Sequence, residues 1–141
     1  MAQSRRARRT RSVLGFDYGL RWIGVATGQT ATGTATPLTR IGARDGVPDW
    51  DAVGRLIEEW QPDVVVVGLP LNMDGSESEL CARARRFGRR LAGRFAQIVE
   101  FQDERLSTRE AYARMHRRPS AEADHALAAQ VILEDWLNAQ N

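Results

Sequence analysis

The chain has 141 residues, of which 43% are apolar and 27% charged, which is ordinary for a globular protein of one domain. All 20 basic residues are arginine, so reactions that depend on a lysine, such as Schiff-base chemistry, are excluded. A single cysteine excludes an internal disulfide and a cysteine-built zinc site, and no apolar run reaches the roughly 20 residues of a membrane span. We therefore expect a cytoplasmic protein without a membrane partner.

The positive charge is concentrated at the N-terminus. Five arginines fall within residues 1–11, and the remaining 15 are outnumbered by 18 acidic residues. This segment has no apolar periodicity, so we expect a disordered, Arg-rich arm over 1–11 followed by one domain over 12–141. Two interpretations of the arm stay open: a nucleic-acid-binding extension, and an extension without function.

The predicted elements begin with strands. Short apolar or Thr-rich runs predict strands over 13–16, 22–26 and 33–36. Pro37 is expected to end the third strand or to confine it to an edge. The second and third strands follow each other closely, which predicts an antiparallel hairpin beside the first.

A helix and a buried strand come next. Asp49 is a predicted N-cap for a helix that reaches Trp60, with Trp60 on its apolar face. Four consecutive valines, 64–67, are typical of a strand that is covered on both faces. Ser76 and Glu79 form a predicted capping box for a second helix, which carries an apolar face from Leu80 to Phe95.

The rest of the chain continues this alternation. We predict a strand over 98–101, a helix from Ser107 to about Met115, and a C-terminal helix from Ser120 to about Leu137. The order predicts an α/β protein: a three-layer fold with a mixed five-stranded sheet and helices on both faces. A ribonuclease-H-like fold has this order, and other three-layer folds share parts of it.

Two acidic residues at strand ends are candidates for chemistry. Asp17 ends the first strand beside Gly19 and Gly24, glycines that permit close backbone approach. Alone, Asp17 is better explained as the polar end of a strand, and the pattern of Asp17 with Gly19 and Gly24 is what makes it a candidate. Glu104 follows the last strand and, taken alone, is explained as a solvated loop charge.

A third acid lies on the C-terminal helix. Asp124 shares a predicted helix face with Leu127, Ala128 and Val131, where a carboxylate needs a partner or a metal. A first-turn acid favoured by the helix dipole is the alternative explanation. Three carboxylates without histidine or cysteine favour Mg²⁺ or Mn²⁺, as in nucleases that activate a water with two metals.

Four motifs stand out in the sequence: residues 15–19 with 23–26, 67–75, 103–108, and 124–129. Together they resemble the YqgF/RuvX family of RuvC-like proteins, which are assigned both to Holliday-junction resolution and to processing of pre-16S ribosomal RNA. The resemblance covers about 13–137. The resemblance implies a ribonuclease-H-like, metal-dependent nuclease with catalytic, metal-binding acids at Asp17, Glu104 and Asp124. This chain departs from the family in its short loop before Asp124, because family members carry a longer basic loop there.

We expect arginines to bind the nucleic acid. The helix over 80–95 carries six of them with no acid between, although a solvated helix face explains such a pattern as well. The candidate nucleic-acid-binding residues are Arg83, Arg86, Arg90, Arg105, Arg109, Arg114, Arg117 and Arg118.

The preferred function is a phosphodiester hydrolase that processes precursor 16S ribosomal RNA, with ribosomal particles as partners. One alternative is a Holliday-junction resolvase acting on branched DNA, and another is a metal-free RNA-binding module in ribosome assembly. An ATPase or kinase fragment is a further alternative, but it needs a second domain that 141 residues cannot supply. We expect a monomer or a weak dimer, because a paired Arg-rich helix would repel its copy.

Overall fold

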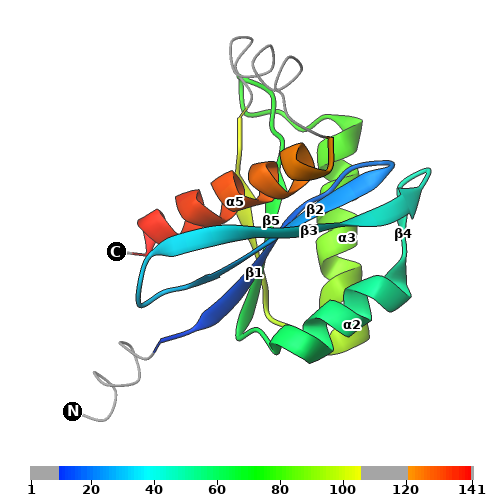
Figure 1. The fold of residues 1–141 in the computed structure, drawn as a ribbon. Coiled ribbons are helices and arrows are strands. Elements are labelled where there is room, and N and C mark those ends of the chain that lie inside the picture. Colours follow the sequence, from blue (N-terminus) through cyan, green and yellow to red (C-terminus); the bar gives the residue numbers. More distant parts are fainter. Residues whose placement is uncertain (1–9, 106–120, 141) are drawn as a thin grey trace.

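A computed structural model describes residues 10–105 and 121–140, with side chains from 124 onward in the second range (Figure 1). The predicted helix from Ser107 to Met115, the loop before Asp124 and most of the N-terminal arm lie outside the described residues. The predicted ribonuclease-H-like α/β architecture is confirmed. None of the described helices is long and apolar enough to cross a bilayer.

The described strands form one mixed sheet in the order β4-β3-β2-β1-β5-β6. Strands β1 to β4 are antiparallel neighbours, whereas β5 and β6 continue the sheet parallel to β1. Their bounds are Ser12–Asp17 (β1), Trp22–Gln29 (β2), Thr34–Arg44 (β3), Val47–Pro48 (β4), Val64–Leu69 (β5) and Val99–Asp103 (β6). The predicted number of five strands is wrong, because β3 turns back at residues 45–46 into the two-residue β4.

Strand β3 is much longer than predicted and runs through Pro37. The register shifts opposite Val25 and Ala26, so Pro37 lies at a bulge. Strand β4 pairs only with Ala43 and Arg44, which leaves β3 an edge strand at the proline. A bulge on an edge is where a sheet tolerates a residue without an N–H group, so Pro37 does not end the strand.

Helices cover both faces of the sheet, as predicted (Figure 1). Helices α2 (Trp50–Trp60) and α3 (Glu79–Phe95) lie on one face, and α5 (Ala121–Ala139) lies on the other. Side chains alternate along the strands, so the valines of β5 divide between two cores. Val65 and Val67 pack toward α2 and α3, and Val64 and Val66 toward α5.

The helix termini confirm one predicted cap and correct another. Asp49 caps α2 by accepting a hydrogen bond from the Ala52 N–H at 3.2 Å. Helix α3 begins two residues later than predicted, because Ser78 rather than Ser76 accepts from the Cys81 N–H. Ser76 instead donates to Asp74 in the preceding turn.

Two predicted core positions are exposed. Trp60 is 38% exposed, because the buried stripe of α2 ends at Ile57, one turn before the helix does. Leu80 is 37% exposed, and the neighbouring Cys81 takes the buried position in the first turn of α3.

Candidate active site

Asp17 lies at the carboxyl end of the central strand β1. Leu14 and Phe16 pack toward α2 and α3, whereas Val13 packs toward α5. Alternation along the strand therefore places the side chain of Asp17 on the α5 face of the sheet. The tight turn after it depends on Gly19, where a Cβ would lie 2.5 Å from the carbonyl oxygen of Trp22.

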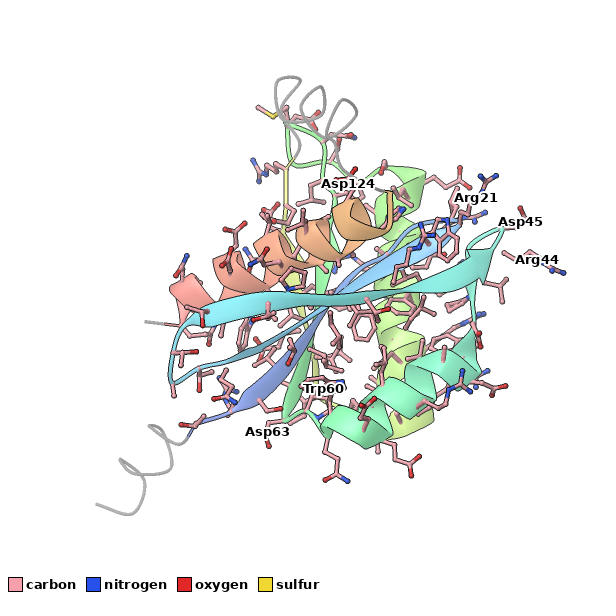
Figure 2. The ribbon with its side chains drawn as sticks, in the orientation of Figure 1. Arg21, Arg44, Asp45, Trp60, Asp63 and Asp124 are labelled. Carbon is pink, nitrogen blue, oxygen red and sulfur yellow. The ribbon has the colours of Figure 1, made fainter. Side chains whose placement is uncertain are left out.

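Gly24 brings the start of α5 against this strand end. It pairs with Asp17 across β1 and β2, and a Cβ on it would overlap the carbonyl oxygen of His125. Only a residue without a side chain allows the backbone of α5 to lie so close to β2. The contact holds the residue before His125, Asp124, beside the end of β1 (Figure 2).

The environment of Asp124 is unusual for a carboxylate. Its Oδ1 atom is shielded from solvent and has no hydrogen-bond partner among the described residues. A buried carboxylate oxygen is costly unless it meets a hydrogen bond or a cation.

The reason that we expected for this burial is wrong. The buried stripe of α5 contains Ala126, Ala129, Ile132 and Leu133, whereas Val131, on the predicted stripe, is 37% exposed. Asp124 therefore does not lie on the core-facing stripe, and its contact with the sheet results from the close approach at Gly24.

Glu104 extends the ladder between β5 and β6. Its backbone N–H donates to the carbonyl oxygen of Leu69 at 2.9 Å. Four residues earlier, in the same phase of the alternation, Glu100 accepts a hydrogen bond from Trp136 of α5, so Glu104 belongs to the α5 face as well. All three predicted acids thus lie at the carboxyl edge of the sheet, and continued alternation would place Glu104 on the same face as Asp17. Glu104 is two strands from Asp17, on the order of 10 Å.

The acids fit a hard divalent cation in part. Asp17 and Asp124 supply carboxylate oxygens, the ligands such ions prefer. The Oδ1 atom of Asp124 has no hydrogen-bond partner in the described part of the chain, and a bound cation would compensate its charge. Within the described ranges, however, no three His, Cys, Asp or Glu side chains are grouped closely enough to hold a metal ion. This does not exclude Mg²⁺, which is commonly held by one or two carboxylates together with waters and substrate phosphates.

A cationic stack that the sequence pattern did not indicate lies beside Asp124. Arg40 of β3 pairs with Gly24 in the sheet, and its guanidinium lies 3.6 Å from the ring centre of Trp22. The Trp22 ring in turn lies 6.4 Å from His125. Burial, and then the charge of Arg40, lower the pKa of His125, while Asp124 opposes the shift. Arg40 could be recognised as a neighbour of this site only from the pairing register of β2 and β3. The bulge shifts that register, so the sequence alone does not reveal it.

The loop between β5 and α3 is held against Arg105. Gly75 adopts a left-handed conformation, and a Cβ there would lie 3.1 Å from the Arg105 guanidinium. Arg105 also lies 3.5 Å from Asp103, so this predicted nucleic-acid-binding residue already has protein contacts. Hydrogen bonds from the side chain and backbone of Ser76 lower the pKa of Asp74 in the same loop.

The arginines of α3 are partly neutralised, contrary to the expectation of an unopposed basic face. Arg85 pairs with Glu77 at 2.9 Å, and Arg83 lies 3.7 Å from Glu79. Glu77 precedes the helix and Glu79 is its first residue, so both acids lie outside the stretch between the arginines that led to the expectation. The other predicted nucleic-acid-binding residues lie outside the described residues; they are Arg109, Arg114, Arg117 and Arg118.

Named relatives match nearly the whole chain. A relative from Aeromonas salmonicida named "Putative pre-16S rRNA nuclease" is 55% identical over 136 residues, covering 93% of this chain and 97% of its own. One from Pectobacterium carotovorum with the same name is 52% identical, covering 94% of this chain and 99% of its own.

Solved structures of low identity show the same fold. RuvC of Thermus thermophilus, in complex with a Holliday-junction substrate, superposes with a TM-score of 0.53 at 17% identity, covering 92% of this chain and 95% of its own. The fowlpox virus resolvase, with Holliday-junction DNA, gives 0.52 at 10% identity, covering 91% of this chain and 97% of its own. A family model described as RuvX, Holliday junction resolvase, matches residues 11–139. The chain therefore belongs to the RuvX family.

Proposed function

We propose that this chain is a nuclease that hydrolyses phosphodiester bonds in precursor 16S ribosomal RNA, with Mg²⁺ or Mn²⁺ held by Asp17 and Asp124 and with Glu104 completing the site. The observation that carries the proposal is the Oδ1 atom of Asp124 beside the end of β1, which is shielded from solvent and has no hydrogen-bond partner among the described residues. Burying that oxygen costs free energy in the protein alone, and a cation would offset the cost.

Each acid has a distinct part in this proposal. Asp17 is fixed by the central strand, which has hydrogen-bonded neighbours on both sides, so its carboxylate is a rigid ligand. Asp124 enters from α5 and is positioned by the contact of His125 with Gly24. Glu104 lies two strands away and would act on the far side of the scissile phosphate. A bound divalent cation would supply activation of water and stabilisation of the leaving oxygen.

The choice of substrate rests on the relatives. Proteins more than 50% identical to this chain are named for pre-16S rRNA, so we assign this chain the same RNA and ribosomal particles as partners. The free thiol of Cys81 accords with a reducing compartment such as the cytoplasm.

Two other functions are weighed against this one. The description of the family model favours a Holliday-junction resolvase with the same chemistry on branched DNA. A metal-free RNA-binding module is disfavoured, because three carboxylates at one edge of the sheet would repel phosphates unless a cation were present.

The decisive experiment offers the purified chain both substrates. Precursor 16S rRNA and a four-way DNA junction are incubated with the wild type and with the Asp17→Asn variant, each with and without Mn²⁺. Metal-dependent cleavage of the RNA by the wild type alone supports the proposal. Paired, symmetric nicks in the junction with intact RNA would establish the resolvase alternative. Binding of RNA without cleavage in any metal would establish the binding module.

A further inference from the structure

A basic pocket lies on the α3 face of the sheet, away from the three acids. It has a volume of about 170 Å³ and lies between α3 and the hairpin that joins β3 to β4. We call it the arginine pocket. The lining residues that matter here are Tyr18, Asp45, Gly46, Arg83, Arg86 and Arg90.

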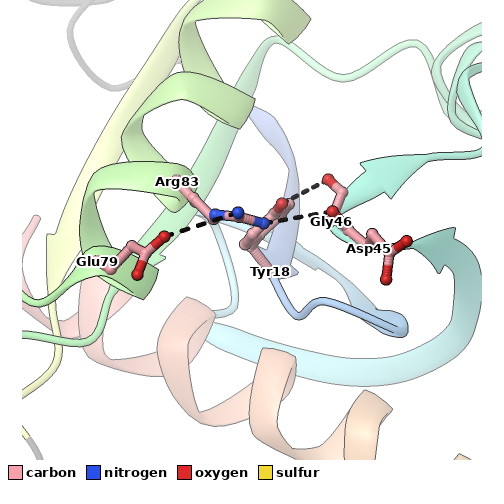
Figure 3. A network of polar contacts seen from close by, with 5 residues as sticks. All are labelled: Tyr18, Asp45, Gly46, Glu79 and Arg83. Carbon is pink, nitrogen blue, oxygen red and sulfur yellow. Dashed lines mark hydrogen bonds and ion pairs between the residues drawn. The ribbon is translucent and has the colours of Figure 1, made fainter.

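One wall of the arginine pocket is held rigid by polar contacts (Figure 3). The Tyr18 hydroxyl donates to the carbonyl oxygen of Gly46, and Arg83 donates to the carbonyl oxygen of Asp45 at 3.3 Å. Asp45 and Gly46 are both left-handed, with φ of 50° and 83°. The Asp45 carboxylate points away from Arg83 in this view, and the charge of Arg83 is met by Glu79 instead.

The other two arginines differ from Arg83. Arg86 and Arg90 are exposed, lie one helical turn apart, and have no ion-pair partner in the part of the chain that the structure describes. Like charges at this spacing destabilise a helix slightly. An anion bound between them would remove the repulsion, and guanidinium groups match the oxygens of phosphate in particular.

We propose that the arginine pocket binds a phosphate group of the nucleic-acid strand that the active site cleaves, an inference that rests on the proposed nuclease function. Arg86 and Arg90 supply the charge, and the fixed guanidinium of Arg83 supplies an oriented donor. The apolar side of the pocket is formed by Trp50 and Phe87, whose rings stack 5.7 Å apart. Trp50 already contacts Arg94 on α3, so the pocket recognises phosphate and not a base.

The position of the arginine pocket would allow one nucleic-acid strand to contact both the pocket and the acids. Tyr18 directly follows Asp17, and alternation sends their side chains to opposite faces of the sheet at the same carboxyl edge. A strand that crosses this edge would place one phosphate in the arginine pocket while another lies among the acids. The pocket would thereby fix which bond is presented for cleavage.

The test compares two double variants that lose the same charge. The variant with Arg86→Ala and Arg90→Ala removes the two arginines of the pocket that have no ion-pair partner among the described residues. Arg55→Ala with Arg89→Ala removes two exposed arginines that do not line it. Binding of a single-stranded RNA from the precursor is followed by fluorescence anisotropy in EDTA over a range of salt concentrations, with thermal melts to check folding.

We expect the pocket variant to bind at least about tenfold more weakly, and its salt slope to fall by about 0.7 for each phosphate of a single strand that the pocket no longer neutralises. The control should show a much smaller decrease in affinity. Asp45→Asn, which removes the one lining carboxylate, should tighten binding. Asparagine also tolerates the left-handed conformation there.

Two further measurements distinguish a terminal from an internal phosphate, and the pocket proposal from the active-site proposal. If 5′-phosphate RNA binds more tightly than 5′-hydroxyl RNA, and only when the pocket is intact, the pocket binds a terminal phosphate. Equal binding of the two identifies an internal one. Equal affinities of the two double variants would overturn the pocket proposal whatever the cleavage result. Asp17→Asn binding RNA normally while still cleaving it would overturn the active site and leave the pocket standing.

Discussion

Gly24→Ala tests how the candidate site is assembled. The added Cβ would overlap the His125 carbonyl oxygen and lie 2.5 Å from its carbonyl carbon, whereas non-bonded carbons keep about 3.5–4.0 Å apart. The first turn of α5 must then retreat from β2 by about 1 Å, and Asp124 moves with it. We expect the free energy of unfolding to fall by about 1–3 kcal/mol, the usual cost of overpacking. Cleavage should fall about 100-fold, because displacing a positioned group by about 1 Å has that effect.

Gly93→Ala is the matched control. A Cβ at Gly93, inside α3, meets nothing within 4 Å, and alanine is favoured over glycine in a helix by about 0.5–1 kcal/mol. The same chemical change should therefore stabilise the protein and leave cleavage unchanged. Urea unfolding and cleavage of precursor RNA in Mn²⁺ are measured for both variants. If Gly24→Ala equalled the wild type in both assays, α5 would not be held against β2 as described. Reduced stability with full activity would show that this contact does not position Asp124.

The remaining predictions concern the acids, a hydrogen bond, the arm and the assembly state. Asp17→Asn, Glu104→Gln and Asp124→Asn should each abolish cleavage while the metal-free proteins melt no lower than the wild type; activity surviving in any two would refute the site. Tyr18→Phe should lower the free energy of unfolding by about 1 kcal/mol in urea, because the Gly46 carbonyl loses its donor, and an unchanged midpoint would contradict that. Deleting residues 1–10 removes four arginines and should weaken the salt dependence of RNA binding; an unaltered slope would mean that the arm does not touch RNA. Sedimentation at micromolar concentration should give a monomer or a weak dimer, since exposed cations on α3 disfavour a self-complementary face, and a tight dimer would favour the resolvase.

The parts of the fold that could be predicted are those that local chemistry determines. The continuous valines of β5 indicated a strand covered on both faces, and the described cores confirm it. Asp49 was recognised as a cap because its side chain acts within three residues of its own position. The path of β3 could not be predicted in this way, because Pro37 is tolerated only through a bulge against β2 and an edge position in the sheet. Both are properties of the pairing and not of the strand itself.

The same distinction explains the site. Residue types and positions made the three acids candidates. The reason for expecting Asp124 on a core stripe was wrong, because small alanines around α5 blur its periodicity. What places Asp124 is the glycine opposite Asp17, since Gly24 allows the helix backbone to contact the strand directly. The position of the helical acid Asp124 thus depends on a residue of the strand on which the helix lies. A glycine facing a helix, in register with a strand-end acid, is a sequence pattern from which such a site can be sought once the pairing of the strands is known.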